Sequence, residues 1–250
     1  MQEWGAGPTL LCVHGLGGGG HFFSGIGPAL AGECHTVAVD LPGSGLSPAM
    51  PAFSFDAAAS ILIDLARHES WLPLSVLGHS MGTIIGLEAV RQAPDMVGSL
   101  VLVGGLPEPQ PAARTRIADR ISEIRRAGLV GIGEQAVATN FSRRTRAERP
   151  ELTGLFARLF EGQSAEGYIT PAEALCAWCA RPLPPLDNVR CLVVTGDEDL
   201  YAPPDAVRAF AGTLPAGSRV EVMPDCGHLP FLEQPLAFAA IVRRFLRPQP

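Results

Sequence analysis

Ser80 stands between two glycines in the run Gly78-His79-Ser80-Met81-Gly82, directly after the apolar residues 74–77. A serine on a sharp strand-to-helix turn adopts a strained backbone, and flanking glycines leave room for its hydroxyl to stand clear of the sheet. Residues 83–90, which follow, have the apolar spacing of a helix. This context predicts that Ser80 is an activated nucleophile.

A serine nucleophile requires a histidine base and an acid that orients this base, because its hydroxyl is weakly nucleophilic at neutral pH. Of the six histidines, only His228 follows a late strand-like run, residues 219–223. We predict that His228 is the base. The strand-like residues 191–194 lead into a row of acidic side chains at 197–199. Asp199 is the predicted acid, because a loop needs a few residues to turn toward a neighbouring loop, and Asp197 is the alternative.

A glycine-rich turn, residues 14–20, follows the strand-like residues 10–13. Amides in such a turn suit either the oxyanion of a tetrahedral intermediate or a phosphate. The chain contains no lysine, since all 19 basic residues are arginine, which excludes a lysine-bearing phosphate loop and a lysine Schiff base. We predict that the amides of Leu16 and Met81 are oxyanion donors, and that the chemistry needs no metal or organic cofactor.

A sheet must hold these residues together, and the pattern of apolar runs predicts one. Strand-like runs occur at 10–13, 36–39, 74–77, 100–103, 191–194 and 219–223. Helical spacing occurs at 21–31, 55–69, 83–92, 204–213 and 236–246. Near-continuous apolar strands between helices predict an α/β fold with a mostly parallel sheet covered on both faces. The predicted site residues then follow the carboxyl ends of strands, where ligands bind in such sheets.

Residues 106–185 break this alternation, because they begin and end with prolines and have helical character. We predict that they form an inserted helical lid, and that residues 1–105 and 186–250 form the core. The lid carries Arg114, Arg116, Arg120, Arg125, Arg126, Arg143, Arg144, Arg146, Arg149 and Arg158. These arginines fit a salt-bridged surface, an inward clamp for a substrate carboxylate, or an outward face that docks an acidic carrier protein.

Taken together, these motifs resemble the α/β-hydrolase superfamily, in particular its single-domain bacterial serine hydrolases: esterases, enol-lactonases and carbon–carbon bond hydrolases. The order serine, acid, histidine is also that of this superfamily. The resemblance spans residues 10–246 and implies the same roles for Ser80, Asp199 and His228. The matching residues are 14–16, 40–47, 78–82, 196–199 with Pro203, and 227–228 with Glu233 and Pro235.

The chain departs from this family pattern at two places. The family usually opens with a short antiparallel hairpin, and only nine residues precede the first strand-like run here. We therefore expect the first antiparallel strand of the sheet to be missing. Carbon–carbon bond hydrolases that resemble this chain usually carry asparagine where it has His79, which weakens the case for that chemistry.

Composition narrows the function classes further. The net charge of −6 argues against nucleic-acid binding. No apolar run approaches the ~20 residues that cross a bilayer, and the first residues lack the features of a signal peptide, so we expect a cytoplasmic protein. The six cysteines do not suggest disulfides or zinc, because two lie in apolar strand runs and the Cys176–Cys179 pair continues a helix-like segment.

The sequence therefore predicts a serine hydrolase that cleaves a small-molecule carboxylic ester or lactone through an acyl-enzyme. Two alternatives of the same fold are a methyl esterase acting on an acyl chain bound to an acidic carrier protein, and a carbon–carbon bond hydrolase. A ligand-binding receptor or scaffold is the alternative from another class, because a fold does not by itself imply turnover. The sequence does not indicate an oligomeric state.

Overall fold

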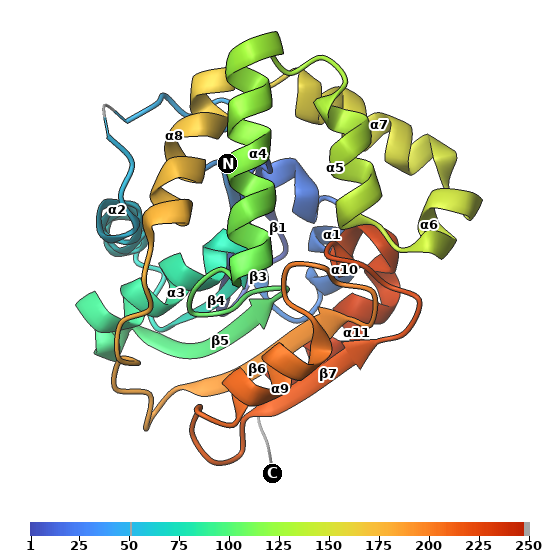
Figure 1. Cartoon of the computed structure of the whole chain (residues 1–250). Helices are drawn as coiled ribbons and strands as arrows, with labels where there is room; N and C mark the ends of the chain where they lie inside the picture. The colour runs from blue at the N-terminus through green and yellow to red at the C-terminus, as the bar shows by residue number, and fades with distance from the viewer. Residues whose placement is uncertain (51, 248–250) are drawn as a thin grey trace.

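One seven-stranded sheet forms the centre of the molecule (Figure 1). The computed structural model describes residues 1–50 and 52–247. Across the sheet the strand order is β1-β3-β2-β4-β5-β6-β7, and all strands except β1 are parallel. The strands are β1 (Gln2–Trp4), β2 (Thr9–Val13), β3 (His35–Val39), β4 (Leu74–His79), β5 (Val97–Val103), β6 (Arg190–Gly196) and β7 (Arg219–Met223). The predicted α/β fold is confirmed.

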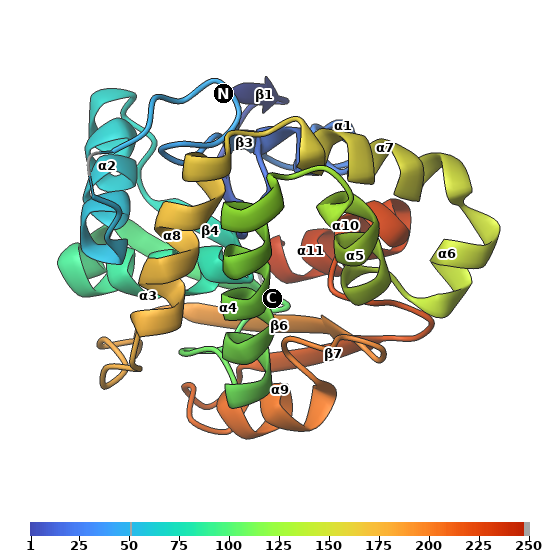
Figure 2. The ribbon, with the colours of Figure 1, turned by 45° about the horizontal axis from the view of Figure 1, so that its top comes forward.

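Helices cover both faces of the sheet, as its apolar strands require. The helices of α9 and α11 lie on opposite sides of the β6–β7 pair in both views (Figures 1 and 2), and every residue of β2 is buried. Outside the interval between β5 and β6 the helices are η1 (Gly20–Phe23), α1 (Gly27–Leu30), α2 (Phe55–His68), α3 (Met81–Gln92), η2 (Pro94–Met96), α9 (Pro204–Ala211), α10 (Pro230–Glu233) and α11 (Pro235–Leu246).

The amino-terminal part differs from the prediction in detail. Residues 21–31 were expected to be one helix, but they form η1 and α1, because Pro28 sits at the start of α1 and cannot continue a preceding helix. The sheet was expected to lack its first antiparallel strand. The structure has one antiparallel strand, β1, which pairs with the edge of β3. Among the described residues before β2, the chain therefore has one antiparallel strand where the family usually has a hairpin of two.

The register of the sheet brings its loops together. Val13 at the end of β2 pairs with Gly78 in β4, and Gly78 pairs with Leu102 in β5. Because the strands are parallel, the turns that follow β2, β4 and β5 emerge at the same edge. The loops after β6 and β7 emerge there too, since Gly196 pairs with Met223. This edge is where the predicted site residues follow their strands.

Five helices separate β5 from β6 in sequence, and they gather on one side of the molecule (green to orange in Figure 1). The helix α4 packs beside α8, and α5 packs beside α7 (Figure 2). We call residues 106–185 the helical segment; its role as a lid stays a prediction. Its helices are α4 (Pro111–Ala127), α5 (Ile132–Asn140), α6 (Arg143–Glu148), α7 (Pro150–Glu161) and α8 (Ala165–Ala177).

Candidate active site

Ser80 occupies a strained turn between β4 and α3. Its φ is 53° and its ψ is −113°, a region that residues with a β-carbon rarely adopt. Its N–H donates to the carbonyl oxygen of Val103 at 2.8 Å. A β-carbon on Gly78 would lie 2.3 Å from the carbonyl oxygen of Gly82, so the turn can close only if position 78 is glycine. The neighbouring backbone therefore holds Ser80 in this conformation.

A buried hydrogen bond joins His228 and Asp199. Nδ1 of His228 lies 2.9 Å from Oδ2 and 3.0 Å from Oδ1 of Asp199. The carboxylate also accepts the N–H groups of Tyr201 and Ala202, at 2.8 and 2.9 Å. Burial acts to raise the pKa of Asp199, but the charge and hydrogen bond of His228 and these two N–H groups outweigh it, so the pKa is lowered. An ionised acid at Nδ1 leaves Nε2 of the imidazole as the proton acceptor.

The other two acidic residues of this loop face different partners. The carboxylate of Asp197 accepts the N–H of Cys226 at 3.1 Å. The carboxylate of Glu198 accepts the N–H of Arg143 at 3.0 Å and pairs with its guanidinium. The structure therefore brings Asp199 to His228 and keeps Asp197 apart from it.

The residues that were predicted to supply oxyanion amides, Leu16 and Met81, belong to the two turns that meet at Ser80. A β-carbon on Gly15 would lie 2.8 Å from Cβ of Ser80, so the turn after β2 touches the serine. Leu16, the next residue, lines the same pocket as Ser80. Met81 is the first residue of α3, so its N–H has no acceptor in a preceding helical turn.

His14 fixes the turn that carries Leu16. Its Nε2 accepts the N–H of Leu41 at 3.0 Å, so Nδ1 carries the proton and donates to the carbonyl oxygen of Gly15 at 2.8 Å. Both bonds need a neutral ring. Burial lowers the pKa of His14 from 6.5 to about 4.

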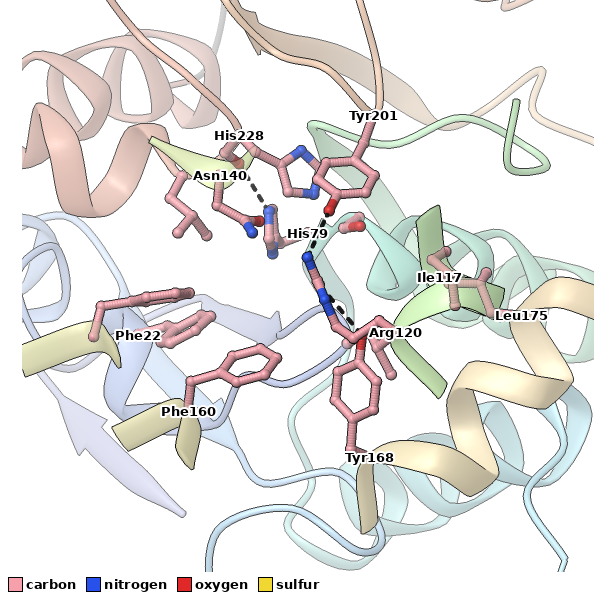
Figure 3. A pocket seen from close by; sticks show the side chains of 14 residues that line it. Phe22, His79, Ile117, Arg120, Asn140, Phe160, Tyr168, Leu175, Tyr201 and His228 are labelled. Carbon is pink, nitrogen blue, oxygen red and sulfur yellow. Dashed lines mark hydrogen bonds between the residues drawn. The ribbon is translucent and has the colours of Figure 1, made fainter. Parts of the chain in front are cut away.

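Ser80 and His228 line one pocket. Figure 3 shows Arg120, Phe160 and Tyr168 of the helical segment around it. Most of its walls are apolar, and four helices of the segment contribute to it. The other lining residues are Leu16, Phe22, His79, Ile117, Arg120, Asn140, Phe156, Phe160, Tyr168, Leu175, Tyr201 and Leu229. A serine and a histidine held by a buried carboxylate, brought together in one apolar pocket, are parts that acyl transfer requires.

The sequence model described as alpha/beta hydrolase fold matches residues 8–235, which is most of the chain. The chain belongs to the α/β-hydrolase family. Within this family it is similar to a pimeloyl-[acyl-carrier protein] methyl ester esterase of Chromobacterium violaceum, with 31% identity over 257 residues, 100% of this chain and 98% of the relative. The corresponding esterase of Neisseria meningitidis serogroup C is 30% identical and covers 95% of this chain and 93% of its own length.

Solved structures of α/β-hydrolases superpose on the whole chain. A thermophilic esterase from Thermogutta terrifontis, in a malate-bound form, has a TM-score of 0.87 and 26% identity, covering 98% of this chain and 92% of its own. The enol-lactonase from Burkholderia xenovorans LB400 has a TM-score of 0.88 and 22% identity, covering 98% and 95%. The second likeness concerns the fold alone.

His79 supports the His228 loop of this α/β-hydrolase, a contact that the sequence did not predict. Nε2–H of His79 donates to the carbonyl oxygen of His228 at 2.9 Å, and the two rings lie 4.7 Å apart (Figure 3). Burial lowers the pKa of His79 well below 6.5. The ring is therefore neutral, and it supports the His228 loop through this hydrogen bond and through the contact between the two rings.

The helical segment is hydrogen-bonded to the same loop. The N–H of His228 donates to the carbonyl oxygen of Asn140 at 2.8 Å. The buried carboxylate of Glu233 accepts the N–H of Ser142 at 2.9 Å and that of Gly227 at 2.8 Å. The sequence matched Glu233 to the family pattern but did not predict these bonds. Its partners lie 91 and 6 positions away along the chain and meet the carboxylate only in the folded protein.

The arginines of the helical segment differ in their surroundings. Seven form ion pairs, Arg126 and Arg146 are exposed, and Arg116 is half-buried and donates to the carbonyl oxygen of Leu200. Arg120 is buried and lines the pocket. The ion pairs are Arg114–Glu108, Arg125–Glu173, Arg143–Glu198, Arg144–Glu148, Arg149–Glu151, Arg158–Glu161 and Arg181–Asp56.

Three further observations concern metals, thiols and membranes. All six cysteines are free. Across residues 1–50 and 52–247, no group of His, Cys, Asp and Glu side chains is arranged to hold a metal ion. No helix in that part of the chain combines the length and the apolar character that crossing a membrane requires.

Proposed function

We propose that this α/β-hydrolase is a serine hydrolase that cleaves a small-molecule carboxylic ester or lactone through an acyl-enzyme. One observation carries the proposal: the buried pair of His228 and Asp199 shares a pocket with Ser80, whose backbone is strained as a nucleophile turn requires. The esterases among the similar proteins support the reaction class.

The proposed mechanism follows from the roles of these groups. His228, oriented by Asp199, takes the proton of Ser80 as the serine oxygen attacks the substrate carbonyl. The amides of Leu16 and Met81 stabilise the oxyanion, and each such donor contributes about 3 kcal/mol to transition-state stabilisation. The protonated His228 then gives its proton to the leaving alkoxide, and a water molecule hydrolyses the acyl-enzyme by the same sequence of proton transfers.

The helical segment, residues 106–185, is in this proposal the lid that shapes the substrate pocket. Its support is the list of pocket residues, since Ile117, Phe160 and Tyr168 come from three of its helices. A lid of apolar side chains excludes water from the reaction and strengthens electrostatic interactions inside the pocket.

Intact-mass detection of an acyl-enzyme tests the nucleophile directly. The protein is mixed with p-nitrophenyl butyrate near pH 8, beside Ser80→Ala and, as a control, Ser122→Ala, an exposed serine on α4. We expect a stoichiometric acyl adduct and turnover in the wild type and in the control, and neither in Ser80→Ala. An unmodified wild type whose rate equals that of Ser80→Ala would reject the hydrolase in favour of a ligand-binding protein of the same fold.

A methyl esterase that acts on a carrier-bound acyl chain is the second candidate. Two similar proteins, at 30 and 31% identity over nearly the whole chain, are esterases of a pimeloyl-[acyl-carrier protein] methyl ester. The exposed arginines Arg143 and Arg146 on α6 offer positive charge to an acidic carrier. If this candidate is correct, Arg143→Ala with Arg146→Ala raises KM for a carrier-bound methyl ester and leaves the hydrolysis of a free ester unchanged. Equal KM values for the variant and the wild type would reject it.

A further inference from the structure

We propose that Arg120 forms a carboxylate-binding subsite, so that the preferred substrate is an ester or lactone that also carries a carboxylate group. The inference rests on the proposed serine hydrolase function and specifies its substrate class. It is carried by a buried guanidinium that faces the pocket of Ser80 without an acidic partner.

Arg120 reaches the pocket from α4 and is largely withdrawn from solvent. Its relative exposure is 9%, and it lines the same pocket as Ser80 and His228. Figure 3 shows the guanidinium between the phenol rings of Tyr168 and Tyr201. A charged group in this position costs several kcal/mol to bury unless a counter-charge compensates it.

In the described part of the chain, all hydrogen-bond acceptors of this guanidinium are neutral oxygens, and its Cζ lies 5.8 Å from the centre of the Phe160 ring. The guanidinium donates to the hydroxyls of Thr139 at 3.2 Å, Tyr168 at 3.4 Å and Tyr201 at 3.5 Å. These bonds are long for a charged donor, and a guanidinium has five N–H groups to satisfy. Burial raises the pKa of Tyr168 to about 12, so this phenol stays neutral and does not serve as the counter-ion.

The pocket itself contains no acidic side chain among its lining residues. Other arginines of the helical segment behave differently, because each of Arg114, Arg125 and Arg158 pairs with a glutamate at the surface. Within residues 1–50 and 52–247, Arg120 is thus the arginine of the segment that is buried and has no carboxylate partner. An anion that enters the pocket would supply the missing counter-charge.

The spacing relative to the reacting groups suits an anion on the substrate itself. The ring of Tyr201 packs against that of His228 in a tilted arrangement, with centroids 4.8 Å apart and an angle of 44° between the planes, and its hydroxyl contacts Arg120. One phenol ring therefore separates the guanidinium from the imidazole. A carboxylate bound to Arg120 and an ester carbonyl at Ser80 can belong to one molecule with a short spacer. A guanidinium fork matches a carboxylate in two parallel hydrogen bonds, and apolar walls strengthen them.

Two esters of equal length test the subsite: mono-p-nitrophenyl adipate, which carries a carboxylate, and p-nitrophenyl hexanoate, which does not. The measured quantity is the ratio of their kcat/KM values after the uncatalysed rates are subtracted. We expect the wild type to prefer the adipate ester, and Arg120→Met to reduce this ratio by about 10- to 100-fold, the value of one charged hydrogen-bonded contact. Arg120→Lys keeps the charge without the fork and should retain part of the preference.

Arg125→Met is the matched control, because Arg125 lies on the same helix at the surface and pairs with Glu173. Its selectivity ratio should equal that of the wild type. An unchanged ratio in Arg120→Met, together with hydrolysis that requires Ser80, would overturn the subsite and leave the hydrolase intact.

The failure of the hydrolase is distinguishable from the failure of the subsite. If neither ester is hydrolysed in a Ser80-dependent way, the proposed function fails, and calorimetric titration with adipate and hexanoate then decides the subsite alone. If the wild type binds adipate more tightly than hexanoate and Arg120→Met loses this difference, the subsite is supported. If the wild type binds the two equally, the subsite is rejected. If Arg120→Met does not fold, the same decision comes from Arg120→Lys and from competition by adipate and hexanoate against the wild type.

Discussion

At the scale of single residues, the environment of Asp199 distinguishes it from the neighbouring acid Asp197. Asp199 accepts the Nδ1–H of His228 and is buried with it. An asparagine in its place would favour the wrong tautomer of the imidazole. We predict that Asp199→Asn lowers kcat by roughly 10³- to 10⁴-fold with little change in KM. Steady-state kinetics on a p-nitrophenyl ester measure this effect.

Asp197→Asn is the control for this prediction. Asp197 bonds to the N–H of Cys226, and an asparagine oxygen can accept the same bond. Its kcat should therefore stay close to that of the wild type. If Asp197→Asn were the variant that lost activity, the assignment of the orienting acid would be reversed.

The buried His14 predicts how stability depends on pH. Its pKa in the folded state is about 4, against 6.5 for an unperturbed ring. As the pH falls from 6.5 toward 4, the unfolded chain takes up a proton that the folded chain refuses, so the free energy of unfolding decreases, by about 3 kcal/mol at most for this group. Above pH 6.5 the group has no effect, because both states are neutral. His79 changes stability in the same direction, since its pKa is lowered too.

Urea unfolding between pH 7 and pH 4 tests this prediction with His14→Gln. The variant loses hydrogen bonds at all pH values, but its stability should decline less steeply on acidification than that of the wild type. His68→Gln, at an exposed position on α2, is the control and should keep the wild-type slope. An unaltered slope in His14→Gln would show that another group dominates the acid transition.

The sequence distinguishes residues in motifs and fails for residues whose role depends on distant packing. Ser80 could be singled out because glycines at 78 and 82 flank it in a five-residue motif that is visible in the sequence. Arg120 could not be separated from the ten other arginines of the helical segment, because its burial depends on Tyr168 and Tyr201, which belong to other elements. The sequence of these helices carries no local signal of which face will meet the pocket.

At the scale of elements, the packing of α3 against β2 explains one of its two glycines. A β-carbon on Gly82 would lie 2.3 Å from the carbonyl oxygen of Val13, which is backbone and cannot move away cheaply. A β-carbon on Gly86, one turn later, would make ordinary contacts at 3.5 and 3.6 Å with Val76 and Leu100. The first glycine is required for close packing, and the second is not.

We therefore predict opposite effects for alanine at these two positions. Gly82→Ala should destabilise the protein by about 3 kcal/mol and displace the turn of Ser80, because overpacking against backbone is costly. Gly86→Ala should stabilise α3 by about 0.5–1 kcal/mol, since alanine is a better helix former. Chemical denaturation of the two variants measures both values. Equal destabilisation would contradict the packing argument.

Helices and strands were predicted well where a single hydrophobic pattern covered the whole element. They were predicted less well where a proline interrupted that pattern or where no hydrophobic pattern was present. The strands β2 to β7 all contain the runs that predicted them. For β2 to β6 the reason is that parallel strands inside a sheet are buried on both faces, whereas β7 lies at the edge of the sheet and is only partly buried. Residues 21–31 read as one helix by apolar spacing, but Pro28 divides them. The short β1 has exposed residues and no apolar pattern, so its pairing with β3 depends on tertiary contact rather than on its own sequence.

At the scale of the whole molecule, Glu233 connects the helical segment to the His228 loop. Its carboxylate accepts two backbone N–H groups, one from each side of this junction. A glutamine would present an NH₂ group to at least one of these donors. We predict that Glu233→Gln costs about 1.5–3 kcal/mol, the range for hydrogen bonds to charged groups, and lowers activity.

Hydrogen exchange locates the effect of this substitution. The amides of Ser142 and Gly227 should both exchange faster in Glu233→Gln, because they lose the same acceptor. Glu151→Gln, at an exposed ion pair on α7, should leave both amides and the free energy of unfolding unchanged. Faster exchange at only one of the two amides would show that Glu233 does not join the two parts.

The bond from the N–H of His228 to the carbonyl oxygen of Asn140 has a consequence for how such chains diversify. Because of this bond, residues 106–185 are not independent of the rest of the fold. A hydrolase of this kind could not acquire a new specificity simply by receiving the whole segment from a relative. The transferred segment would have to place the carbonyl oxygen of residue 140 at the N–H of His228 and the N–H of residue 142 at the carboxylate of Glu233. Without these two hydrogen bonds, the loop that carries His228 would lose its support. Exchange of this segment is therefore restricted to relatives that make the same two hydrogen bonds. Single substitutions elsewhere on the five helices do not disturb these bonds and can change the specificity one residue at a time.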